Sequence, residues 1–379
     1  MKITSIEPTP SPYSMKINVD EQLPDGETEN YKADDELTTA PLYVQNLFNI
    51  NGVKGLYRVI DFLALERNPR VPWEDILPEV RQVLGSAEKS VDEGLKPSGE
   101  TNDHFGEIKV FIQMFRNIPM QVKLEDGNQE HRFGLPDRFM NAVMDASTAS
   151  ENMLMERKWV EQGPRYGDVQ EIGQDVVNEI DASYDSDRIA ELVKLAKNNT
   201  ALDEQNPSPW RKVTLEMLDA PDWKDRYAAL DRMAPTMEDL PVLDKALDDT
   251  KGSVRRLATA YLGMIEEKEV LPYLYKAMKD KAVNVRRTAG DCLSDLGFTE
   301  AIPEMISALA DKNRLVRWRA AMYLYEVGDN TAIPALRKAL NDPEFEVRMQ
   351  VKMALARIEE GEEAKGSIWH QMTQAAKQK

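Results

Sequence analysis

The chain has 379 residues, 42% of them hydrophobic, and a formal net charge of −18 at pH 7. This length predicts two or three domains with cores of their own, and the acidity argues against a general binder of nucleic-acid backbones, which needs a basic face. The one cysteine, Cys292, excludes a disulfide framework and any metal cluster held by this chain's thiolates alone. No apolar run reaches the roughly 20 residues of a membrane helix, so we expect a soluble, cytoplasmic protein.

Residues 1–85 are predicted to form a small α/β domain. The expected elements are, in order, a strand, a helix, two strands and a helix, at residues 15–19, 41–48, 53–60, 62–66 and 71–84. Strands and helices in this order are typical of a small sandwich in which helices cover a sheet. Residues 86–104 then turn polar and charged, with scattered glycine and proline, and we interpret them as a linker.

Three segments of this first domain have a distinctive sequence: Thr9 to Lys16 (TPSPYSMK), Leu47 to Val53 (LFNINGV) and the pair Trp73 and Glu74. They resemble the N-terminal domain of Nfu/NifU-type iron–sulfur scaffold proteins. In that family a separate C-terminal domain with a Cys-x-x-Cys motif holds the cluster, and this sequence has no such motif. The resemblance therefore implies a fold and a possible set of partners, without cluster binding.

Residues 105–200 are predicted to form a second domain, of the α+β class. Three strands come first and three helices follow, at residues 108–115, 120–124, 130–134, 136–149, 169–181 and 187–196. A turn at 125–128 joins the second strand to the third as a hairpin. Two segments of this domain stand out, FIQMFRNIPMQV at 111–122 and ERKWVEQGPRYG at 156–167.

Residues 207–360 are predicted to form an all-α solenoid. A 31-residue unit is repeated four times, and each copy has a proline at the start of its first helix: Pro241, Pro272, Pro303 and Pro334. A second helix carries a Val-Arg pair, and a degenerate copy at 210–236 precedes the regular units. A fixed period of this length is typical of arrays in which each helix pair buries its apolar side against the next pair. Residues 361–379 are predicted to be a polar tail.

The repeats resemble HEAT-like repeats of the phycobilisome-lyase type. The two segments of the second domain resemble the middle domain of the conserved virulence factor C family of Gram-positive bacteria, whose architecture is an Nfu-like head, this middle block and a HEAT-like tail. The resemblance covers almost the whole chain. It implies a multidomain α+β fold and, in some members, a role in gene expression or virulence traits, and it carries over no catalytic residue.

No arrangement of residues in the sequence points to catalysis. The three histidines, His104, His131 and His370, lie far apart in the chain. No His-Glu pair occurs of the kind that binds iron in HEAT-like hydroxylases such as deoxyhypusine hydroxylase. A Walker loop, a dinucleotide-binding fingerprint and a Gly-x-Ser-x-Gly motif are also missing. We therefore predict a protein that is not an enzyme, with no cofactor and no metal.

An arginine row runs through the repeats, each arginine six residues after an aspartate. The pairs are Asp249 and Arg255, Asp280 and Arg286, Asp311 and Arg317, and Asp342 and Arg348. We interpret the row as a structural ladder, because bidentate arginine can tie the turn of one repeat to the next helix. The alternative is a basic stripe for an acidic partner, to which four less regular cations would add: Arg256, Arg287, Arg314 and Arg319.

A basic and aromatic cluster in the second domain also has two interpretations. It comprises Arg157, Lys158, Trp159, Arg165 and Tyr166, around a Gly-Pro pair. Aromatic side chains between cations can stack nucleic-acid bases or clamp a peptide. The structural alternative is that Trp159 anchors the core beside a tight turn.

Three functional hypotheses follow. In the first, the chain is a non-catalytic adaptor whose repeats bind a protein partner, and replacing Arg256, Arg287 and Arg319 by glutamate abolishes binding without unfolding the chain. In the second, the Nfu-like head makes the chain an accessory factor in iron–sulfur metabolism. In the third, the chain is a nucleic-acid-linked regulator, which its acidity disfavours. No membrane partner is expected, and the identity of the partner and the oligomeric state are open.

Overall fold

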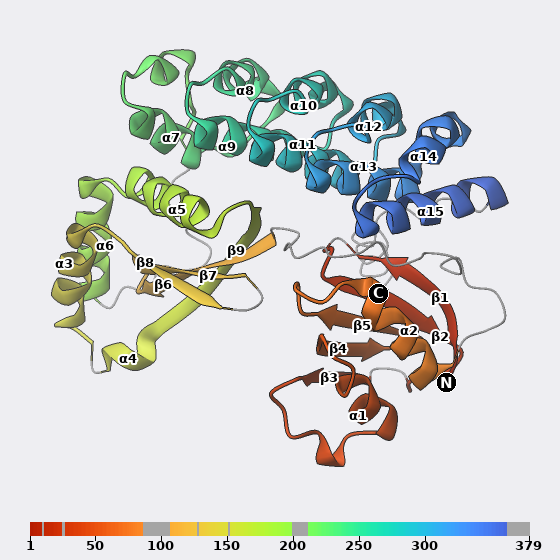
Figure 1. Ribbon diagram of the computed structural model, residues 1–379. Helices are drawn as coiled ribbons and strands as arrows, with labels where there is room; N and C mark the ends of the chain where they lie inside the picture. The colour runs from red at the N-terminus through yellow and green to blue at the C-terminus, as the bar shows by residue number, and fades with distance from the viewer. Residues whose placement is uncertain are drawn as a thin grey trace. The chain divides into compact units, whose positions relative to one another are not determined.

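The described residues fall into two compact units whose division does not follow the chain order. The computed structural model describes residues 1–9, 11–24, 27–85, 107–126, 129–150, 152–198 and 211–361. The first unit comprises Met1–Phe105 with Leu293–Lys379, and the second comprises Gly106–Cys292 (Figure 1). Both units contain repeats, and the boundary crosses helix α11 (Val283–Leu296). The predicted linker at 86–104, and the predicted tail beyond Gly361, lie outside the described residues.

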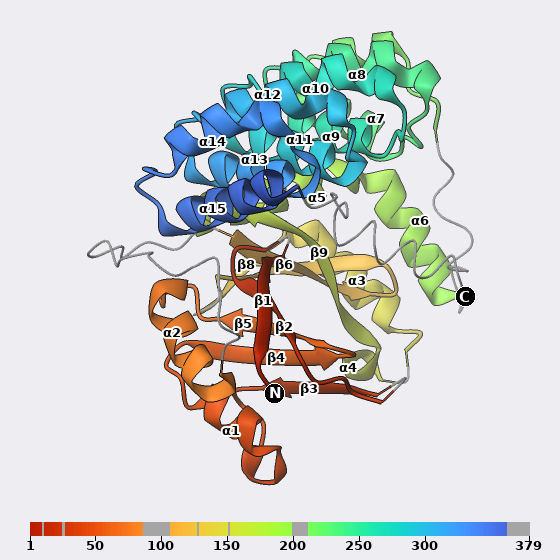
Figure 2. The ribbon, with the colours of Figure 1, turned by 90° about the vertical axis from the view of Figure 1, so that its right-hand side faces the viewer.

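Among the described residues of the first unit, five antiparallel strands form one sheet in the order β1-β2-β5-β4-β3. The strands are β1 (Ile3–Pro8), β2 (Ser14–Val19), β3 (Thr28–Lys32), β4 (Val53–Val59) and β5 (Phe62–Arg67). Helices α1 (Leu42–Phe48) and α2 (Trp73–Leu84) accompany the sheet (Figure 2). The sequence predicted β2, β4 and β5 but missed the two outer strands. In β3 the reason is plain, because none of its five residues is buried and no apolar alternation marks it.

The last repeats of the first unit pack directly on this head. Their helices are α12 (Ile302–Ala308), α13 (Arg314–Val327), α14 (Ile333–Ala339) and α15 (Phe345–Glu360). Phe345, Met349 and Met353, at helical spacing on α15, belong to the same buried cluster as Trp73 of the head. Arg67 of β5 donates to Glu346 at 2.8 Å beside this contact. The head and the terminal repeat therefore share one core.

The second unit holds a four-stranded antiparallel sheet in its described part, in the order β8-β7-β6-β9. The strands are β6 (Glu107–Phe115), β7 (Ile118–Glu125), β8 (Glu130–Gly134) and β9 (Arg157–Tyr166). The described part of this domain also contains helices α3 (Asp137–Ser147), α4 (Met153–Glu156), α5 (Val169–Ser183) and α6 (Ser186–Lys197). Strand β9 was not predicted, because it has no buried residue; it pairs with β6 as an edge strand.

The repeats of the second unit begin with the degenerate copy. Its helix is α7 (Trp223–Asp231), preceded by the 3-10 turn at Leu215–Asp219, and α8 (Leu240–Leu247), α9 (Gly252–Gly263) and α10 (Leu271–Ala277) follow. In each unit the short first helices form one layer and the longer second helices another (Figures 1 and 2). The four repeat prolines lie in the first turn of α8, α10, α12 and α14, where a missing N–H costs nothing.

These elements confirm the predicted multidomain α+β fold class, with α/β and α+β parts before a helical array. Within the described ranges, none of the helices combines the length and the apolar character that crossing a membrane requires.

The close fit of helix to sheet in the second unit depends on one glycine. A side chain on Gly173 of α5 would overlap the ring of Phe133 on β8. This position therefore requires glycine although it lies inside a helix.

We predict that Gly173→Ala destabilises the chain. Alanine favours a helix by up to about 1 kcal/mol, but overpacking of this kind costs about 1–3 kcal/mol, so we expect a net loss in urea unfolding. Gly163→Ala is the matched control, because a Cβ there meets nothing within 4 Å. Equal stability of the two variants would show that α5 does not lie this close to β8.

Candidate functional site

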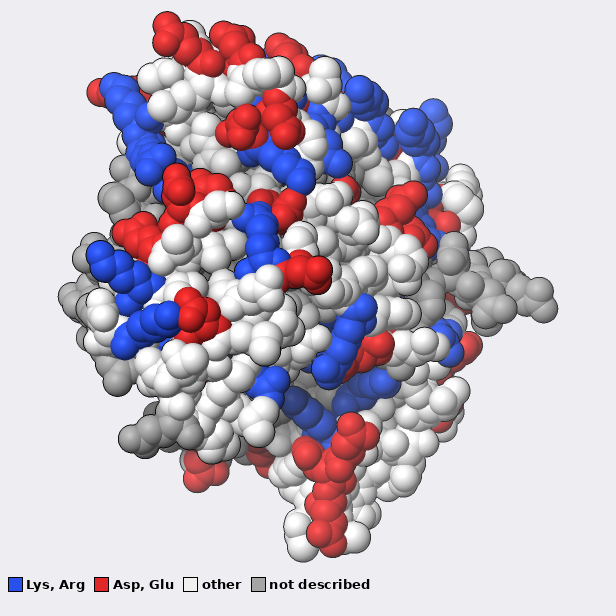
Figure 3. Space-filling model, turned by 90° about the vertical axis from the view of Figure 1, so that its left-hand side faces the viewer, with Lys and Arg blue, Asp and Glu red and all other residues white. Residues whose placement is uncertain are grey.

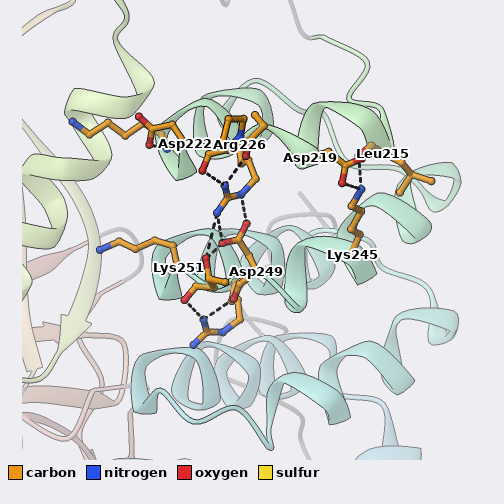
Figure 4. A network of polar contacts seen from close by, with 12 residues as sticks. Leu215, Asp219, Asp222, Arg226, Lys245, Asp249 and Lys251 are labelled. Carbon is orange, nitrogen blue, oxygen red and sulfur yellow. Dashed lines mark hydrogen bonds and ion pairs between the residues drawn. The ribbon is translucent and has the colours of Figure 1, made fainter.

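The arginine row forms bidentate bridges between successive repeats. In three arginines, Nε and one terminal nitrogen donate to the two carboxylate oxygens of the aspartate that lies in the turn of the following repeat. The distances are between 2.6 and 3.0 Å. The pairs are Arg226 with Asp249 (Figure 4), Arg255 with Asp280, and Arg317 with Asp342. The remaining terminal nitrogen donates to the carbonyl six residues earlier, as in Arg286 to Asp280 at 2.8 Å. The three arginines of the bidentate pairs thus join their own turn to the turn of the next repeat.

The aspartates of the row are held ionised by these contacts. Asp249 also accepts the backbone N–H of Lys251 at 2.7 Å, and Asp280 accepts that of Ala282 at the same distance. Burial alone would raise the pKa of Asp249 and Asp280, but the arginine and backbone bonds outweigh it and lower both pKa values below the usual range. The row is therefore a set of paired charges.

The two ends of the row differ from its middle. Arg226 belongs to the degenerate copy, and aligning Pro221–Arg226 with Pro343–Arg348 would have added it to the predicted row. Arg348, in the last described repeat, keeps its bond to the Asp342 carbonyl at 2.8 Å and donates to Glu74 in the first turn of α2 at 3.2 Å. Within the first unit the row therefore ends on the head domain.

A second link between repeats was not predicted. Lys245 donates to Asp219 at 2.5 Å (Figure 4), and Lys276, one repeat later, donates to Asp244 and Asp248 at 2.8 Å each. The two lysines hold the same position in the 31-residue unit. Because the side chains of these three ion pairs are partly to largely exposed, each pair contributes at most about 1 kcal/mol.

Arg256, predicted as a partner-binding cation, contacts α5 within the second unit, and 13% of its side chain is exposed. It donates to both oxygens of Glu179 at 3.1 and 3.2 Å, and Arg165 of β9 donates to the same carboxylate at 2.8 Å. Burial lowers the pKa of Arg165, and the Arg256 charge lowers it further. Burial would raise the pKa of Glu179, but the two guanidiniums hold it below its usual range. One carboxylate therefore serves two arginines.

Arg287 of α11 is directed to the same domain. Its guanidinium lies 4.5 Å from the centre of the Tyr166 ring, donates to the Tyr166 hydroxyl at 3.1 Å and pairs with Asp291 at 2.9 Å. Only 1% of its side chain is exposed. Two further ion pairs join the repeats to α5, Lys251 with Asp175 at 3.5 Å and Lys224 with Asp181 at 2.5 Å. The second helices here bind the chain's own middle domain.

The other two predicted cations lie in the first unit. Arg319 is 6% exposed and stacks on the ring of Trp318 at 5.6 Å. Arg314 is half-buried and pairs with Glu344 of the following turn at 3.5 Å. The prediction that Arg256, Arg287 and Arg319 form an exposed basic stripe is therefore wrong, because internal carboxylates and aromatic rings already cover them. Reversing their charge would disrupt cores.

The residues of the basic and aromatic cluster at 157–166 lie on different faces of the sheet and do not form one group. Arg165 and Tyr166 enter the buried contacts with Glu179 and Arg287. Trp159, in contrast, lies half-buried on the opposite face of the sheet, so the prediction that it anchors the core is wrong. Arg157 pairs with Phe115 across the strands, and Lys158 is exposed. The spacing of Trp159 and Arg165 is even, so alternation alone would put them on one face. The register shift that separates the pair Ile108–Arg165 from the pair Val110–Gln162 places one extra residue in β9 and sends them to different faces.

Trp159 has partners from other strands, which the sequence did not reveal. Lys123 of β7 lies 5.0 Å from the centre of its ring and 4.4 Å from that of Phe111 on β6, and Arg132 of β8 lies 5.7 Å from Trp159. The strand register sets Phe111 opposite Lys123 and Lys123 opposite Arg132. We call Phe111, Lys123, Arg132 and Trp159 the sheet-face cluster.

The charge around this cluster is mixed. Lys123 pairs with Glu125 at 2.6 Å and Arg132 pairs with Glu130 at 2.5 Å. On the face of the molecule drawn in Figure 3, basic and acidic side chains are likewise interspersed. Among the described residues, no group of three or more His, Cys, Asp and Glu side chains could hold a metal ion. The cluster therefore combines two aromatic rings with two cations that each pair with a neighbouring carboxylate.

We predict that Arg256→Gln lowers the free energy of unfolding by about 1.5–3 kcal/mol. The variant loses the hydrogen bonds to the charged Glu179, which are worth about that much, and it leaves no carboxylate uncompensated because Arg165 still pairs with Glu179. Arg132→Gln, at a side chain that is 56% exposed, is the matched control with an expected change within about 0.5 kcal/mol. Urea unfolding of the full chain measures both, and a silent Arg256 variant would contradict the buried arrangement.

A second prediction concerns Glu326 of α13, which accepts a hydrogen bond from Ser294 at 2.9 Å. Burial raises the pKa of Glu326 to about 7, with Asp295 adding to the rise and Arg319 and Ser294 opposing it. The protonated form is favoured in the fold, so stability is full below about pH 4.5 and is lost as pH rises through 7.

The variant Glu326→Gln, which keeps an acceptor for Ser294, should then gain up to about 3 kcal/mol over the parent chain at pH 8. At pH 4 the difference should vanish. Unfolding free energies of both chains across this range test the sign, and a gain that grows toward low pH would contradict it.

Three family profiles match the chain in succession. The profile described as scaffold protein Nfu/NifU N terminal matches residues 3–90, the one described as virulence factor matches residues 113–193, and the HEAT repeats profile matches 212–289 and 274–356. The chain is also similar to a structure of protein SAV1430 from Staphylococcus aureus, with 31% identity, 22% of this chain and 98% of that chain covered, and a TM-score of 0.21.

Two relatives match over most of their length. The uncharacterized protein YpgR of Bacillus subtilis (strain 168) is 58% identical over 380 residues, which cover 100% of this chain and 99% of that protein. Conserved virulence factor C of Staphylococcus haemolyticus (strain JCSC1435) is 43% identical over 272 residues, 71% of each chain. The resemblance inferred from the two segments of the middle domain is thereby confirmed, and the chain belongs to the conserved virulence factor C family.

Proposed function

We propose that the chain is a non-catalytic scaffold that binds a protein partner through the sheet-face cluster. The observation that supports this is the convergence of Phe111, Lys123, Arg132 and Trp159 from separate strands on one sheet face. Tryptophan and arginine are the residues on which protein interfaces most often depend. A rigid sheet holds them in fixed positions, so little conformational entropy is lost on binding.

The repeats have a different task in this proposal. Their second-helix arginines are used inside the chain, Arg256 and Arg287 on the middle domain and Arg348 on the head. A charged side chain that already has a buried partner is not available to a second protein without breaking that contact. The array therefore acts as a frame for the head and the middle domain, and an effect on virulence traits would come through the partner of those domains.

The test is cross-linked capture from cells that express the chain natively, with the full-length protein as bait. We expect Trp159→Ala combined with Arg132→Glu to lose the partner by at least tenfold while the unfolding curve stays the same, because both side chains lie on the sheet surface. Arg337→Glu is the control, at an exposed arginine of α14 paired with Glu359. Partner loss in the control alone would move the binding surface to the repeats.

Nucleic-acid binding is the second candidate, because aromatic rings between cations can also stack bases. The carboxylates of Glu125 and Glu130 beside the cluster, and the net charge of −18, weigh against it. Retardation of single-stranded RNA or DNA at low salt, lost in the Trp159→Ala chain, would favour this candidate over a protein partner.

An accessory role in iron–sulfur metabolism is the third candidate. It rests on the match of residues 3–90 to the Nfu/NifU N-terminal profile. Cluster-assembly proteins among the captured partners, together with reduced cluster-enzyme activity in a deletion strain, would favour it. Full activity of those enzymes in the deletion strain would remove it.

A further inference from the structure

The second unit contains a cavity of about 340 Å³ on the face of the sheet opposite to the sheet-face cluster. Its walls come from β6 and β9, from α5, from the start of α6 and from α7. Val110 and Val176 make part of an apolar floor, and Arg165, Glu179, Arg188 and Asp231 bring charges to the wall. Sites for small molecules typically measure roughly 300–1,000 Å³ and combine apolar lining with a few polar groups, so this cavity has the size of a small ligand.

The charged residues that line the cavity are two arginines and two carboxylates, and an excess arises with Arg256, which is not a lining residue but binds the same Glu179. Arg165 and Arg256 share the single carboxylate of Glu179. Arg188 has its own carboxylate, Asp231, at 3.3 Å, and Asp175, one turn before Glu179, is paired with Lys251. Among the described side chains this leaves one positive charge in excess in a buried place.

Two further observations concern the arginines that share Glu179. Nε of Arg256 is buried without a hydrogen-bond partner, although arginine usually satisfies its donors when it is buried. Burial, and then the charge of Arg256, lower the pKa of Arg165, whereas burial at Arg256 is outweighed by Glu179 and the pKa of that arginine is raised, so the shared carboxylate compensates Arg256 better than Arg165. An anion in the cavity would supply the missing negative charge.

The remaining polar groups suit an oxyanion. Tyr184 and Tyr227 both line the cavity, and burial raises the pKa of each phenol, so both hydroxyls stay protonated and able to donate at neutral pH. Arg188 stacks on the Tyr184 ring at 4.0 Å, which holds its planar guanidinium in one orientation. Guanidinium and hydroxyl donors above an apolar floor fit a ligand with one charged end and one apolar end.

We propose that this cavity binds a small organic monoacid, with its carboxylate on Arg165 and its apolar body against Val110 and Val176. One excess positive charge calls for a singly charged anion, since a phosphate dianion would overcompensate it. The ligand would bridge β9, α5 and α7, and so would stabilise the contact between the middle domain and the first repeats. This inference does not depend on the sheet-face cluster, which lies on the other side of the sheet.

The test uses the full-length chain with benzoate and hexanoate as probes, and benzamide and hexanamide as their neutral counterparts. Thermal unfolding and ligand-observed NMR should show that at least one acid binds and raises the unfolding temperature, because a ligand that binds only the folded state stabilises it. Its amide should bind at least tenfold more weakly. Binding by neither acid at millimolar concentration, or equal binding by acid and amide, would overturn the proposal.

Location is tested with two variants on one strand. Gln162 is exposed and lines the cavity, so Gln162→Trp should block the cavity without altering the core and should abolish acid binding. Glu161→Trp, on the opposite face of β9, should leave binding unchanged. Arg165→Gln should weaken binding at least tenfold where the chain remains folded. Acid binding that survives in the Gln162 variant, or tighter binding of phenyl phosphate than of benzoate, would contradict the site or the class of ligand.

Discussion

The bidentate bond from an arginine to the aspartate of the next turn is the contact on which the array depends. It satisfies three needs of a repeat at once, since the same guanidinium also caps a carbonyl of its own turn and the aspartate also accepts a backbone N–H. Turn groups that would otherwise lack partners are thereby paired. Lysine could not do this, because a single ammonium lacks the planar fork that reaches a carboxylate and a carbonyl together. The bond also sets the spacing of the helices, which is why the 31-residue period can be kept.

The ladder determines where the other arginines go. Successive residues on a helix are about 100° apart, so Arg256, directly after the ladder residue Arg255, emerges on another side of α9. That side meets α5 in the second unit, and the equivalent side of α15 meets the head in the first. A solenoid usually offers such a face to other molecules. Here the chain's own domains occupy it at both ends of the repeat series, which directs the search for a partner to the exposed faces of those domains.

How much the sequence could predict follows from how local each signal is. The helices of the repeats were predictable because each position of the repeat occurs several times in the chain. Each copy therefore supports the assignment made for the others. Strands β3 and β9 were not, because edge strands with polar residues on both faces carry no alternation. The cluster at 157–166 was recognised as a group but divided incorrectly, since an irregularity in the pairing of β9 with β6 puts Trp159 and Arg165 on different faces despite their even spacing. The partners of these residues, Lys123 and Glu179, come from other elements and leave no mark near them in the sequence.

The shared carboxylate of Glu179 shows what such long-range pairing can conceal. In the sequence the two arginines belong to different candidate binding groups, Arg256 to the basic stripe and Arg165 to the basic and aromatic cluster. Only the fold brings both onto one acid, in a place where desolvation makes a missing negative charge costly. A family that merely needed to attach its middle domain to the repeats could have done so with a balanced pair or with apolar side chains. Retaining a surplus guanidinium beside a cavity is better explained by an anion that completes the contact than by the attachment alone.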